Sequence, residues 1–449
     1  MQKRWIILFV ALLSVSFLGL FYSGHEGVFT DIDPNLNFAD IAWMITATIF
    51  VLMMTPGLSF FYGGMVRSKN VISTMLQSFI AMGVISVIWV VVGFSLAFGE
   101  DIGHFIGNPG TFFMFVNVGG ATDKLLAPTI PLALYALFQM KFAIITPSLI
   151  TGSFAERVRF SGYLVFMILF CIFVYCPLAH WTWHPDGFLR QMGVLDFAGG
   201  IVVHASSGVA ALAGAIFLGK RKESGQPANI PFVLLGAAML WLGWFGFNAG
   251  SSLAANAVAV KAFLNTNTAS ATAMMTWVVF DCLRGRKPSA MGAAIGAVVG
   301  LVAITPSAGY VTVGESIFIA LVVTIICNMA VSWKNKKNSF DDALDVFPTH
   351  GVGGIVGTIM TGIFVYNAAE NITYWQNLLN HIIAVVIVCG YTFIVTYALY
   401  WITDKMIPMR VSEKSEKIGL DMSQHDERYG IETNRELAEY FDHGVDTKS

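Results

Sequence analysis

The stretch DFAGGIVVHASSGVAALAGAIFL, residues 196–218, decides the fold. After its first residue it contains no Asp, Glu, Lys or Arg, and His204 is its one further titratable side chain. About 20 apolar residues cross the hydrocarbon core of a bilayer as a helix. The stretch therefore predicts a membrane-spanning helix with a histidine inside the membrane, where such groups usually face the bundle interior or a pathway.

A second stretch, DVFPTHGVGG at residues 345–354, repeats the order of acid, histidine and glycines. Five predicted spans separate the two stretches, so the two halves of the chain would have inverted topology. Transporters built in this way bind their substrates near the midplane, where the repeats meet. We therefore predict a shared site in which His204 and His350 touch, although each histidine could instead only hydrogen-bond across two helices. Small residues, which let helices approach closely, flank both histidines: Gly199, Gly200, Ala205, Gly208, Gly351, Gly353, Gly354 and Gly357.

Each of the two stretches also opens with a carboxylate, Asp196 in the first and Asp345 in the second. The plain interpretation is a helix N-cap that accepts backbone N–H bonds. A carboxylate beside the membrane core could in addition favour cations at a nearby site.

Apolar windows of this kind recur along the whole chain of 449 residues, which is 56% hydrophobic and 12% charged. A soluble domain carries roughly 25% charge, so the composition predicts an all-α integral membrane protein. It excludes a soluble enzyme of ordinary type and a basic nucleic-acid binder. Eleven windows are predicted to span the membrane: 40–64, 71–98, 129–154, 160–180, 197–218, 230–254, 266–282, 289–306, 315–333, 348–366 and 377–403.

The loops between these windows lie alternately on the two sides of the membrane. The loops of one side carry thirteen basic residues, and those of the other side, with the adjoining helix ends, carry four. Because Lys and Arg accumulate in cytoplasmic loops, the richer set is predicted to lie inside, with the first core span starting outside and the C-terminus inside. The richer set is Arg67, Lys69, Arg157, Arg159, Lys220, Arg221, Lys222, Arg284, Arg286, Lys287, Lys334, Lys336 and Lys337. The poorer set is Lys124, Lys141, Arg190 and Lys261.

The two ends of the chain differ from the membrane domain predicted for residues 38–407. Residues 1–24 place Lys3 and Arg4 before an apolar run, a pattern typical of a signal peptide. No A-x-A cleavage site is evident, so an uncleaved extra helix stays open. Residues 408–449 are polar and charged and predict a cytosolic C-terminal tail.

Aromatic residues gather at the predicted outer ends of the spans. Phe138 and Phe142 are four residues apart, on one helical face. Trp183 precedes a His-Pro-Asp-Gly turn, and Ser251 ends the run GWFGFNAGS. Trp241 and Trp244 lie in the sixth span, and since tryptophan near a membrane end is usually an interface residue, most of these aromatic residues are assigned that role. Trp183 with Ser251 could instead hold a small cation by cation–π attraction and a hydrogen bond.

From about Ala39 to about Tyr429 the chain resembles the ammonium transporter family, which includes the Amt, Mep and related Rh proteins. The matching strings are Pro56-Gly57 with FYGG at 61–64, FQ at 138–139 with FA at 142–143, AERVRF at 155–160, DFAGG at 196–200 with VH at 203–204, GWFGFNAGS at 243–251, and DVF at 345–347 with HGVGG at 350–354.

The resemblance implies a homotrimer of eleven-helix subunits in the cell membrane, for a bacterium the inner membrane, in which each subunit takes up ammonium through its own pore. Its family roles map onto this chain as follows: an outer cation site at Trp183 and Ser251, a stacked gate at Phe142 and Phe247, a twin-histidine proton relay at His204 and His350, and a supporting carboxylate at Asp196. Ammonium would lose its proton at the outer site, and ammonia would cross the apolar pore. No cofactor or metal is implied.

Two places depart from the family pattern. Lys141 directly precedes Phe142, where a small or polar uncharged residue is expected. Its stem could snorkel outward to water, or its charge could stand at the mouth and repel ammonium. In the tail, residues 420–429 are similar to the family's HGExAY signature, but Asp426 replaces the glycine. In bacteria that tail helps to dock trimeric P-II signal proteins on the inner face, so a P-II partner is implied.

Two other classes of function stay open. Paired histidines in a membrane protein could be axial haem ligands, and an ammonium-binding protein could signal through its tail as a sensor rather than transport. The five cysteines have no paired or metal-type spacing.

Overall fold

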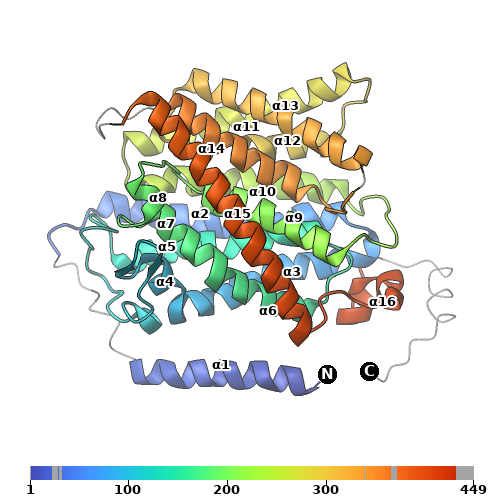
Figure 1. Cartoon of the computed structure of the whole chain (residues 1–449), viewed down its shortest axis with the longest axis horizontal. Coiled ribbons are helices and arrows are strands. Elements are labelled where there is room, and N and C mark those ends of the chain that lie inside the picture. Colours follow the sequence, from blue (N-terminus) through green and yellow to red (C-terminus); the bar gives the residue numbers. More distant parts are fainter. Residues whose placement is uncertain (1, 23–28, 30–32, 338, 366–371, 431–449) are drawn as a thin grey trace.

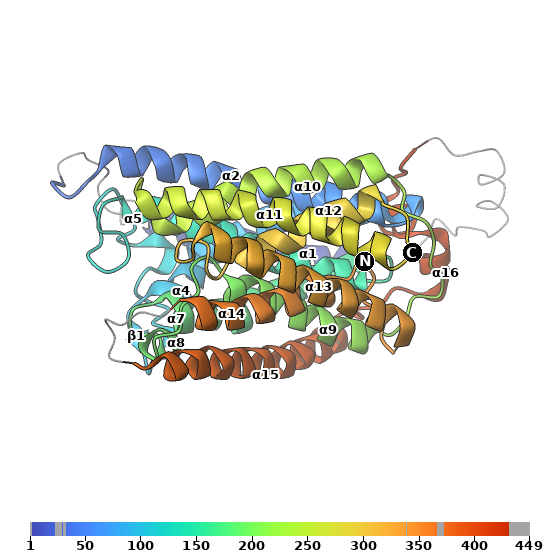
Figure 2. The same ribbon diagram turned by 90° about the horizontal axis from the view of Figure 1, so that it is seen from above.

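The computed structural model describes residues 2–22, 29, 33–337, 339–365 and 372–430. The described chain is a bundle of helices that run along a common axis (Figures 1 and 2). At one end, the hairpin end, β1 (Asp101–Ile102) pairs with β2 (Ile106–Gly107). At the other, the tail end, lies the short helix α16 (Glu413–Ile418). The rest of the predicted tail, residues 431–449, and residues 1, 23 and 24 of the predicted leader lie outside the described residues.

The long helices follow the apolar windows of the sequence. They are α1 (Gln2–Tyr22), α2 (Phe38–Met65), α3 (Val71–Ile88), α5 (Leu132–Ile150), α6 (Phe160–Phe170), α9 (Ser206–Leu218), α10 (Ile230–Trp244), α11 (Ala257–Leu283), α12 (Ala290–Ile304), α13 (Val313–Lys337), α14 (Val352–Phe364) and α15 (Tyr374–Met406). Short helices lie at or near the hairpin end: α4 (Phe94–Phe98), α7 (Cys176–Trp183) and α8 (Phe188–Gln191).

Several of these helices are extended by a wider π-helical turn at one end. These turns are η2 (Trp89–Gly93), η5 (Cys171–Tyr175), η6 (Gly200–Ala205), η7 (Phe245–Ala249) and η9 (Phe347–Gly351). Such turns are rare and are frequent at functional sites. Both histidines of the sequence analysis lie in them, His204 in η6 and His350 in η9.

Within the described residues, nine helices are long and apolar enough to cross a membrane. Eight coincide with predicted core spans, and the ninth, Trp5–Tyr22, belongs to α1. The predicted spans 266–282, 289–306 and 348–366 lie on α11, α12 and the pair η9–α14, which are helical but fall outside this criterion. The finding supports a multi-pass helical membrane protein, while the number of eleven spans stays a prediction.

The helix α1 lies apart from the bundle, along its side (Figure 1). None of its apolar window is buried. Its last residue, Tyr22, meets the Phe113 ring edge to face at 5.3 Å. A helix that exposes apolar side chains all round is stable in lipid rather than in water.

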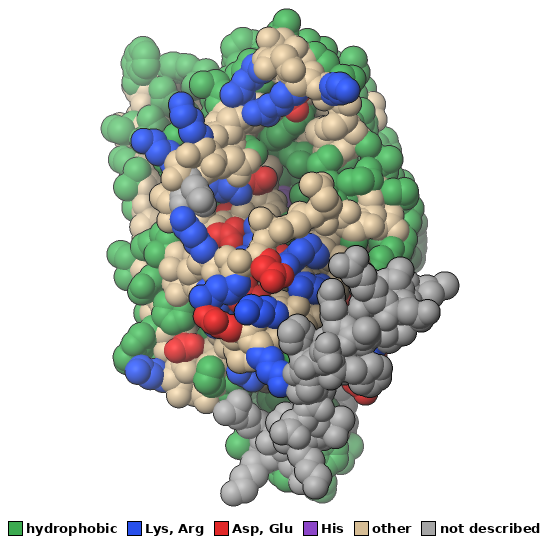
Figure 3. All heavy atoms as spheres, turned by 90° about the vertical axis from the view of Figure 1, so that its right-hand side faces the viewer, with side chains coloured by type: hydrophobic (Ala, Val, Ile, Leu, Met, Phe, Trp, Pro, Cys, Tyr) green, Lys and Arg blue, Asp and Glu red, His purple; other side chains and the backbone are tan. Residues whose placement is uncertain are grey.

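Charged side chains gather on the tail end of the bundle, whereas hydrophobic side chains cover its flanks (Figure 3). This distribution agrees with an apolar belt around the helices and a polar cap at their ends, as a bilayer requires.

Candidate functional site

Two interrupted helices cross at the centre of the bundle, and glycines make the crossing possible. One is η6 with α9, and the other is η9 with α14. A Cβ atom on Gly208 would lie only 2.1 Å from the backbone nitrogen of Gly351. One on Gly354 would lie 2.6 Å from the carbonyl oxygen of Gly200. The two backbones are therefore in direct contact, and no side chain fits between them.

This crossing brings two imidazoles together. The Nδ1 atoms of His204 and His350 are 3.3 Å apart, and the ring centroids are 5.4 Å apart with 28° between the planes. Both side chains are buried, at 1% and 3% exposure. A hydrogen bond between two ring nitrogens needs one donor and one acceptor, so the pair holds a proton between its members. The Nε2 atom of His204 has no hydrogen-bond partner within the described residues.

A small cavity lies against the imidazole pair. Its lining is apolar apart from the two histidines: Met54, Leu58, Phe61, Ile145, Leu149, Leu240, Trp244, Phe247 and Val298. A charge is costly in such surroundings, whereas a neutral molecule is not.

Aromatic rings close this cavity on one side. Phe142 of α5 and Phe247 of η7 stack with centroids 4.2 Å apart and 25° between the planes. Both are buried, at 1% and 0% exposure. The Phe247 centroid lies 5.9 Å from that of His204. On the other side of the stack, Trp183 meets Phe142 edge to face at 5.8 Å. The order is therefore Trp183, the phenyl stack, His204 and His350.

Hydrogen bonds fix Trp183 and Ser251, which lie on the side of the phenyl stack away from the histidines. The indole Nε1–H of Trp183 donates to the carbonyl oxygen of Asp196 at 3.0 Å. The hydroxyl of Ser251 donates to the carbonyl oxygen of Phe247 at 2.8 Å, so its lone pairs stay available as acceptors. Both residues are partly exposed. Trp183 is thus tied to the residue that precedes η6, and Ser251 to the phenyl stack.

The carboxylate of Asp196 holds the start of η6. Its two oxygens accept four backbone N–H bonds, from Gly199, Gly200, Ile201 and Val202, at 2.9, 2.6, 2.8 and 3.3 Å. These N–H groups begin a helix and have no intrahelical partner. The side chain is 5% exposed. Asp196 therefore stabilises the turn that presents His204.

The comparisons with known proteins agree with this geometry. The Ammonium Transporter Family matches residues 42–429. The chain belongs to the ammonium transporter family. It is 44% identical over 402 residues to a putative ammonium transporter of Methanothermobacter thermautotrophicus, covering 87% of this chain and 98% of that one.

Solved structures of the family are also similar. Mep2 of Saccharomyces cerevisiae superposes with a TM-score of 0.80 at 34% identity and covers 90% of this chain and 94% of its own. A structure titled Sensor Amt Protein superposes with a TM-score of 0.80 at 30% identity, covering 86% and 98%. The resemblance expected from the sequence strings is thus confirmed.

One prediction at the second repeat was wrong. The first backbone N–H of η9, that of Phe347, donates at 2.7 Å to Asp342 and not to Asp345. Asp345 instead forms an ion pair with Lys334 of α13 at 2.5 Å. The reason is local: Asp345 has a φ of 58°, which turns the chain away from the helix start. Asp342 precedes His350 by eight residues, as Asp196 precedes His204.

The sequence analysis gave Trp244 no role in the site, since it assigned most of the outer aromatic residues to the membrane interface. The residue is 1% exposed, and its ring stacks on His204 at 5.2 Å and 22°. Its Nε1–H donates to Thr305 at 2.9 Å. The signal was present in the sequence, because Trp244, Phe247 and Ser251 recur at helical spacing on one face.

Lys141 does not snorkel to water in the structure. Its side chain is 8% exposed, and its Nζ lies 3.7 Å from the sulfur of Met140. No ion pair of Lys141 is recorded among the described residues. The amine of Lys141, a residue of α5, is therefore held within the helix packing.

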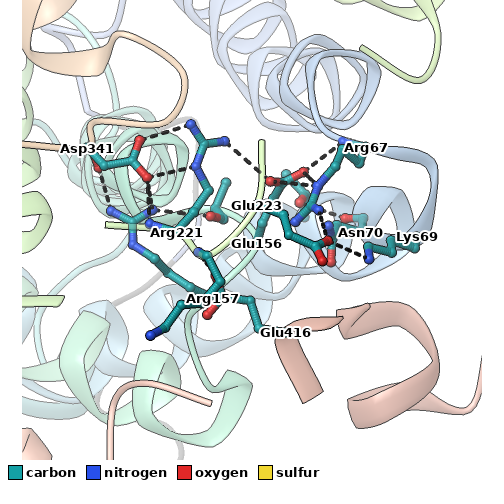
Figure 4. A network of polar contacts seen from close by, with 12 residues as sticks. Arg67, Lys69, Asn70, Glu156, Arg157, Arg221, Glu223, Asp341 and Glu416 are labelled. Atoms are coloured by element: carbon teal, nitrogen blue, oxygen red, sulfur yellow. Dashed lines mark hydrogen bonds and ion pairs between the residues drawn. The ribbon is translucent and has the colours of Figure 1, made fainter. Parts of the chain in front are cut away.

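A network of ion pairs joins the loops of the tail end (Figure 4). Glu156, 1% exposed, accepts from Arg67 at 3.1 Å and from Arg221 at 3.3 Å. Arg221 also binds Asp341 through two nitrogens, at 2.8 and 2.9 Å. Burial alone would raise the pKa of Asp341, but Arg221 and Arg157 lower it to about 2. Ion pairs thus hold together the four loops that carry Arg67, Glu156, Arg221 and Asp341.

The first part of the tail is bound against this end of the bundle. The Asp421 carboxylate accepts from the backbone nitrogens of Ile72 and Ser73 at 3.1 and 2.8 Å, at the start of α3. The Leu420 N–H donates to the side chain of Asn70 at 2.8 Å. Burial raises the pKa of Asp421 to about 6. The tail is therefore part of the folded domain as far as it is described.

Proposed function

We propose that the protein is a multi-pass ammonium transporter of the cell membrane, and not an enzyme. The observation that carries the proposal is the stack of Phe142 and Phe247 directly beside a buried pair of touching imidazoles. An apolar passage that ends at shared-proton histidines suits a substrate that crosses neutral and gives up its proton.

The proposed transport begins at the mouth. The face of Trp183 attracts ammonium by cation–π interaction, and the hydroxyl of Ser251 accepts one of its hydrogen bonds. Potassium has a similar size but can neither donate hydrogen bonds nor lose a proton. The site therefore favours ammonium where both ions are present.

Ammonium then separates into ammonia and a proton. Ammonia passes the rings of Phe142 and Phe247 and crosses the apolar cavity, where an intact ion would be unstable. The proton moves by way of His204 and His350, whose Nδ1 atoms are already within hydrogen-bond distance. Asp196 acts by holding η6 in place rather than by touching the substrate, because all its contacts in the site are backbone N–H groups.

The orientation and assembly are also proposed. The hairpin end faces outward and the tail end inward, in line with the basic loops at the tail end. Eleven spans in residues 38–407 form an inverted five-plus-five repeat, and three subunits assemble into a homotrimer, in a bacterium in the inner membrane. Residues 1–24 form a signal peptide or an extra helix, and the tail at 408–449 offers a surface for a P-II protein.

The deciding experiment compares charge movement in wild-type protein and a double variant. Purified protein in proteoliposomes receives pulses of ammonium and of potassium while current is recorded. Wild type is expected to respond to ammonium alone, and the variant with His204→Leu and His350→Leu is expected to lose this selective current while still assembling. His381→Gln is the control, since His381 is buried outside the pore lining and bonds Asn377 and Leu195. Wild-type current and selectivity in the double variant would remove the relay role.

A second function, ammonium sensing, is favoured by the likeness to the structure titled Sensor Amt Protein. A sensor would bind ammonium at Trp183 and change the contacts of the tail without passing substrate. Radiolabelled methylammonium that binds purified protein but does not accumulate in proteoliposomes would support the sensor.

A further inference from the structure

The two carboxylates that begin the interrupted helices are placed alike but bonded differently. Asp196 and Asp342 each precede a pore histidine by eight residues. Both oxygens of Asp196 are occupied by backbone N–H groups. In Asp342, Oδ2 accepts from Phe347 and the backbone N–H of Val346 also acts on the carboxylate, whereas Oδ1 makes no hydrogen bond of good geometry within the described residues, although the residue is 0% exposed. Unpaired buried oxygens are rare and call for an explanation.

The surroundings connect Asp342 to the cavity. The charge of Asp342 acts on the Tyr62 hydroxyl, and that hydroxyl donates to the carbonyl oxygen of Leu149, a residue that lines the cavity. The next residue, Ala343, donates its N–H to Ser153 at 3.0 Å. The hydroxyl of Ser153 is also buried and has no hydrogen-bond partner among the described residues. An unpaired carboxylate oxygen and an unpaired hydroxyl thus lie on adjoining segments, one of which follows Leu149 of the cavity lining by four residues.

The charges around Asp342 leave it free to exchange a proton. Lys334 pairs with Asp345 and donates to the backbone carbonyl of Asp342, so it forms no direct bond with the Asp342 carboxylate. Arg157 acts on it from a distance, and Tyr62 faces it from α2. Burial, with the neighbouring charge of Asp345 acting in the same direction and Lys334 in the opposite one, raises the pKa of Asp342 to about 6. An acid with a pKa near the pH at which it operates transfers protons in both directions.

We propose that Asp342 is the proton acceptor at the inner end of the pore, where it receives the proton carried by His350. The inference rests on the proposed function, because it extends the histidine relay. The Asp342 carboxylate accepts from the first backbone N–H of η9, that of Phe347, and His350 lies three residues further along the same turn. The imidazolium of His350 gives its proton to the carboxylate and leaves a neutral imidazole and a carboxylic acid. The acid then protonates emerging ammonia, which restores the carboxylate and forms ammonium.

The test records ammonium-driven current in proteoliposomes whose lumen is buffered from about pH 5 to about pH 8. The share of subunits with the tail inside is measured by protease digestion. Below pH 6 Asp342 is protonated and cannot accept, and above it the carboxylate can. Wild-type current from tail-inside subunits is therefore expected to rise as the lumenal pH increases through about 6.

Variants separate this role from a purely structural one. In Asp342→Asn, whose amide oxygen can still accept from Phe347, the charge moved per ammonia taken up is expected to fall about tenfold or more, and the pH step to vanish. Asp342→Glu is expected to restore both. Asp281→Asn is the matched control, because Asp281 is also a buried carboxylate of the tail end, at 8% exposure, but pairs with Arg286.

Each outcome decides the proposal. Wild-type current and an unchanged pH step in Asp342→Asn overturn it and leave the histidine relay standing. Ammonia uptake without current in wild type overturns the relay itself, and with it this inference. If Asp342→Asn does not assemble, the lumenal pH profile of wild type decides, and a flat profile overturns the proposal.

Discussion

Trp183 joins the phenyl stack to the start of η6, because its ring meets Phe142 edge to face and its Nε1–H donates to the carbonyl oxygen of Asp196. Replacement by leucine removes the ring face. We expect Trp183→Leu to weaken the apparent ammonium affinity by about 1 kcal/mol, roughly fivefold. Trp183→Phe, which keeps a ring but not the N–H donor, should recover part of that loss. The concentration dependence of ammonium current measures both, and leucine and wild type with the same half-saturation would return Trp183 to an interface role.

Lys141 gives a prediction about stability. A buried lysine amine that forms no ion pair with any described residue lowers the free energy of unfolding, by about 1–3 kcal/mol for an unsatisfied polar group. Lys141→Met fills the same space without charge and is expected to raise the thermal midpoint of the purified protein. Lys124→Met, which replaces an exposed lysine, should leave the midpoint unchanged.

Lys141→Met also tests whether the amine of Lys141 repels ammonium at the proposed entrance. Buried charges are screened much less by salt than exposed ones. If the amine repels ammonium, Lys141→Met should raise the apparent affinity at low and at high ionic strength alike. A lower thermal midpoint in Lys141→Met would contradict the stability argument and show that the amine has a partner in the assembled protein.

At the scale of elements, the sequence predicted most of the helices and could not predict how some of them begin. Long apolar runs are sufficient for a helix such as α9, but α11 starts nine residues before its predicted window because polar side chains face inward there. Asn265, for example, donates to the carbonyl oxygens of Ala308 and Val311. Hydropathy alone does not show which polar residues are satisfied in this way.

The residues of the candidate site also fall into those that the sequence predicted and those that it could not predict. The pairing of His204 with His350 followed from a repeated pattern, and Phe142 and Phe247 from family strings. Asp342 was missed because the choice between it and Asp345 depends on a left-handed residue, and a non-glycine residue at positive φ has no reliable sequence signal. Trp244 shares a helical face with Phe247 and Ser251, but the ring it stacks on, that of His204, lies 40 residues away in sequence, and helical spacing does not identify that partner.

The docked tail is an element with a testable attachment. Asp421→Ala removes the acceptor for two N–H groups at the start of α3, a loss typically worth about 1 kcal/mol. We expect faster protease cleavage within residues 408–430 than in wild type. Glu413→Ala is the control, since Glu413 belongs to the same tail but is 67% exposed and pairs with Lys222 at the surface. Equal cleavage of both variants would show that the tail is held by other contacts.

For the whole molecule, the basic loops predict which end faces the cytoplasm. In a Cys282→Ser background, Lys124→Cys should react with a membrane-impermeant maleimide in intact cells, because it would lie outside. Lys287→Cys should react only after the membrane is permeabilised. Both positions are exposed in the subunit, so access depends on the side of the membrane. The reverse labelling pattern would invert the proposed topology.

The contact between Gly208 and Gly351 has a consequence for how such a protein can evolve. A methyl group added to Gly208 meets backbone atoms of the other helix, and no change of side chain at Gly351 can make room for it. A single substitution of either glycine is therefore expected to destabilise the protein, and a second substitution at the other glycine cannot compensate for it. Descendants of this sequence are expected to vary at the mouth, in the tail and along the lipid-facing helices, while they inherit this pair of glycines together.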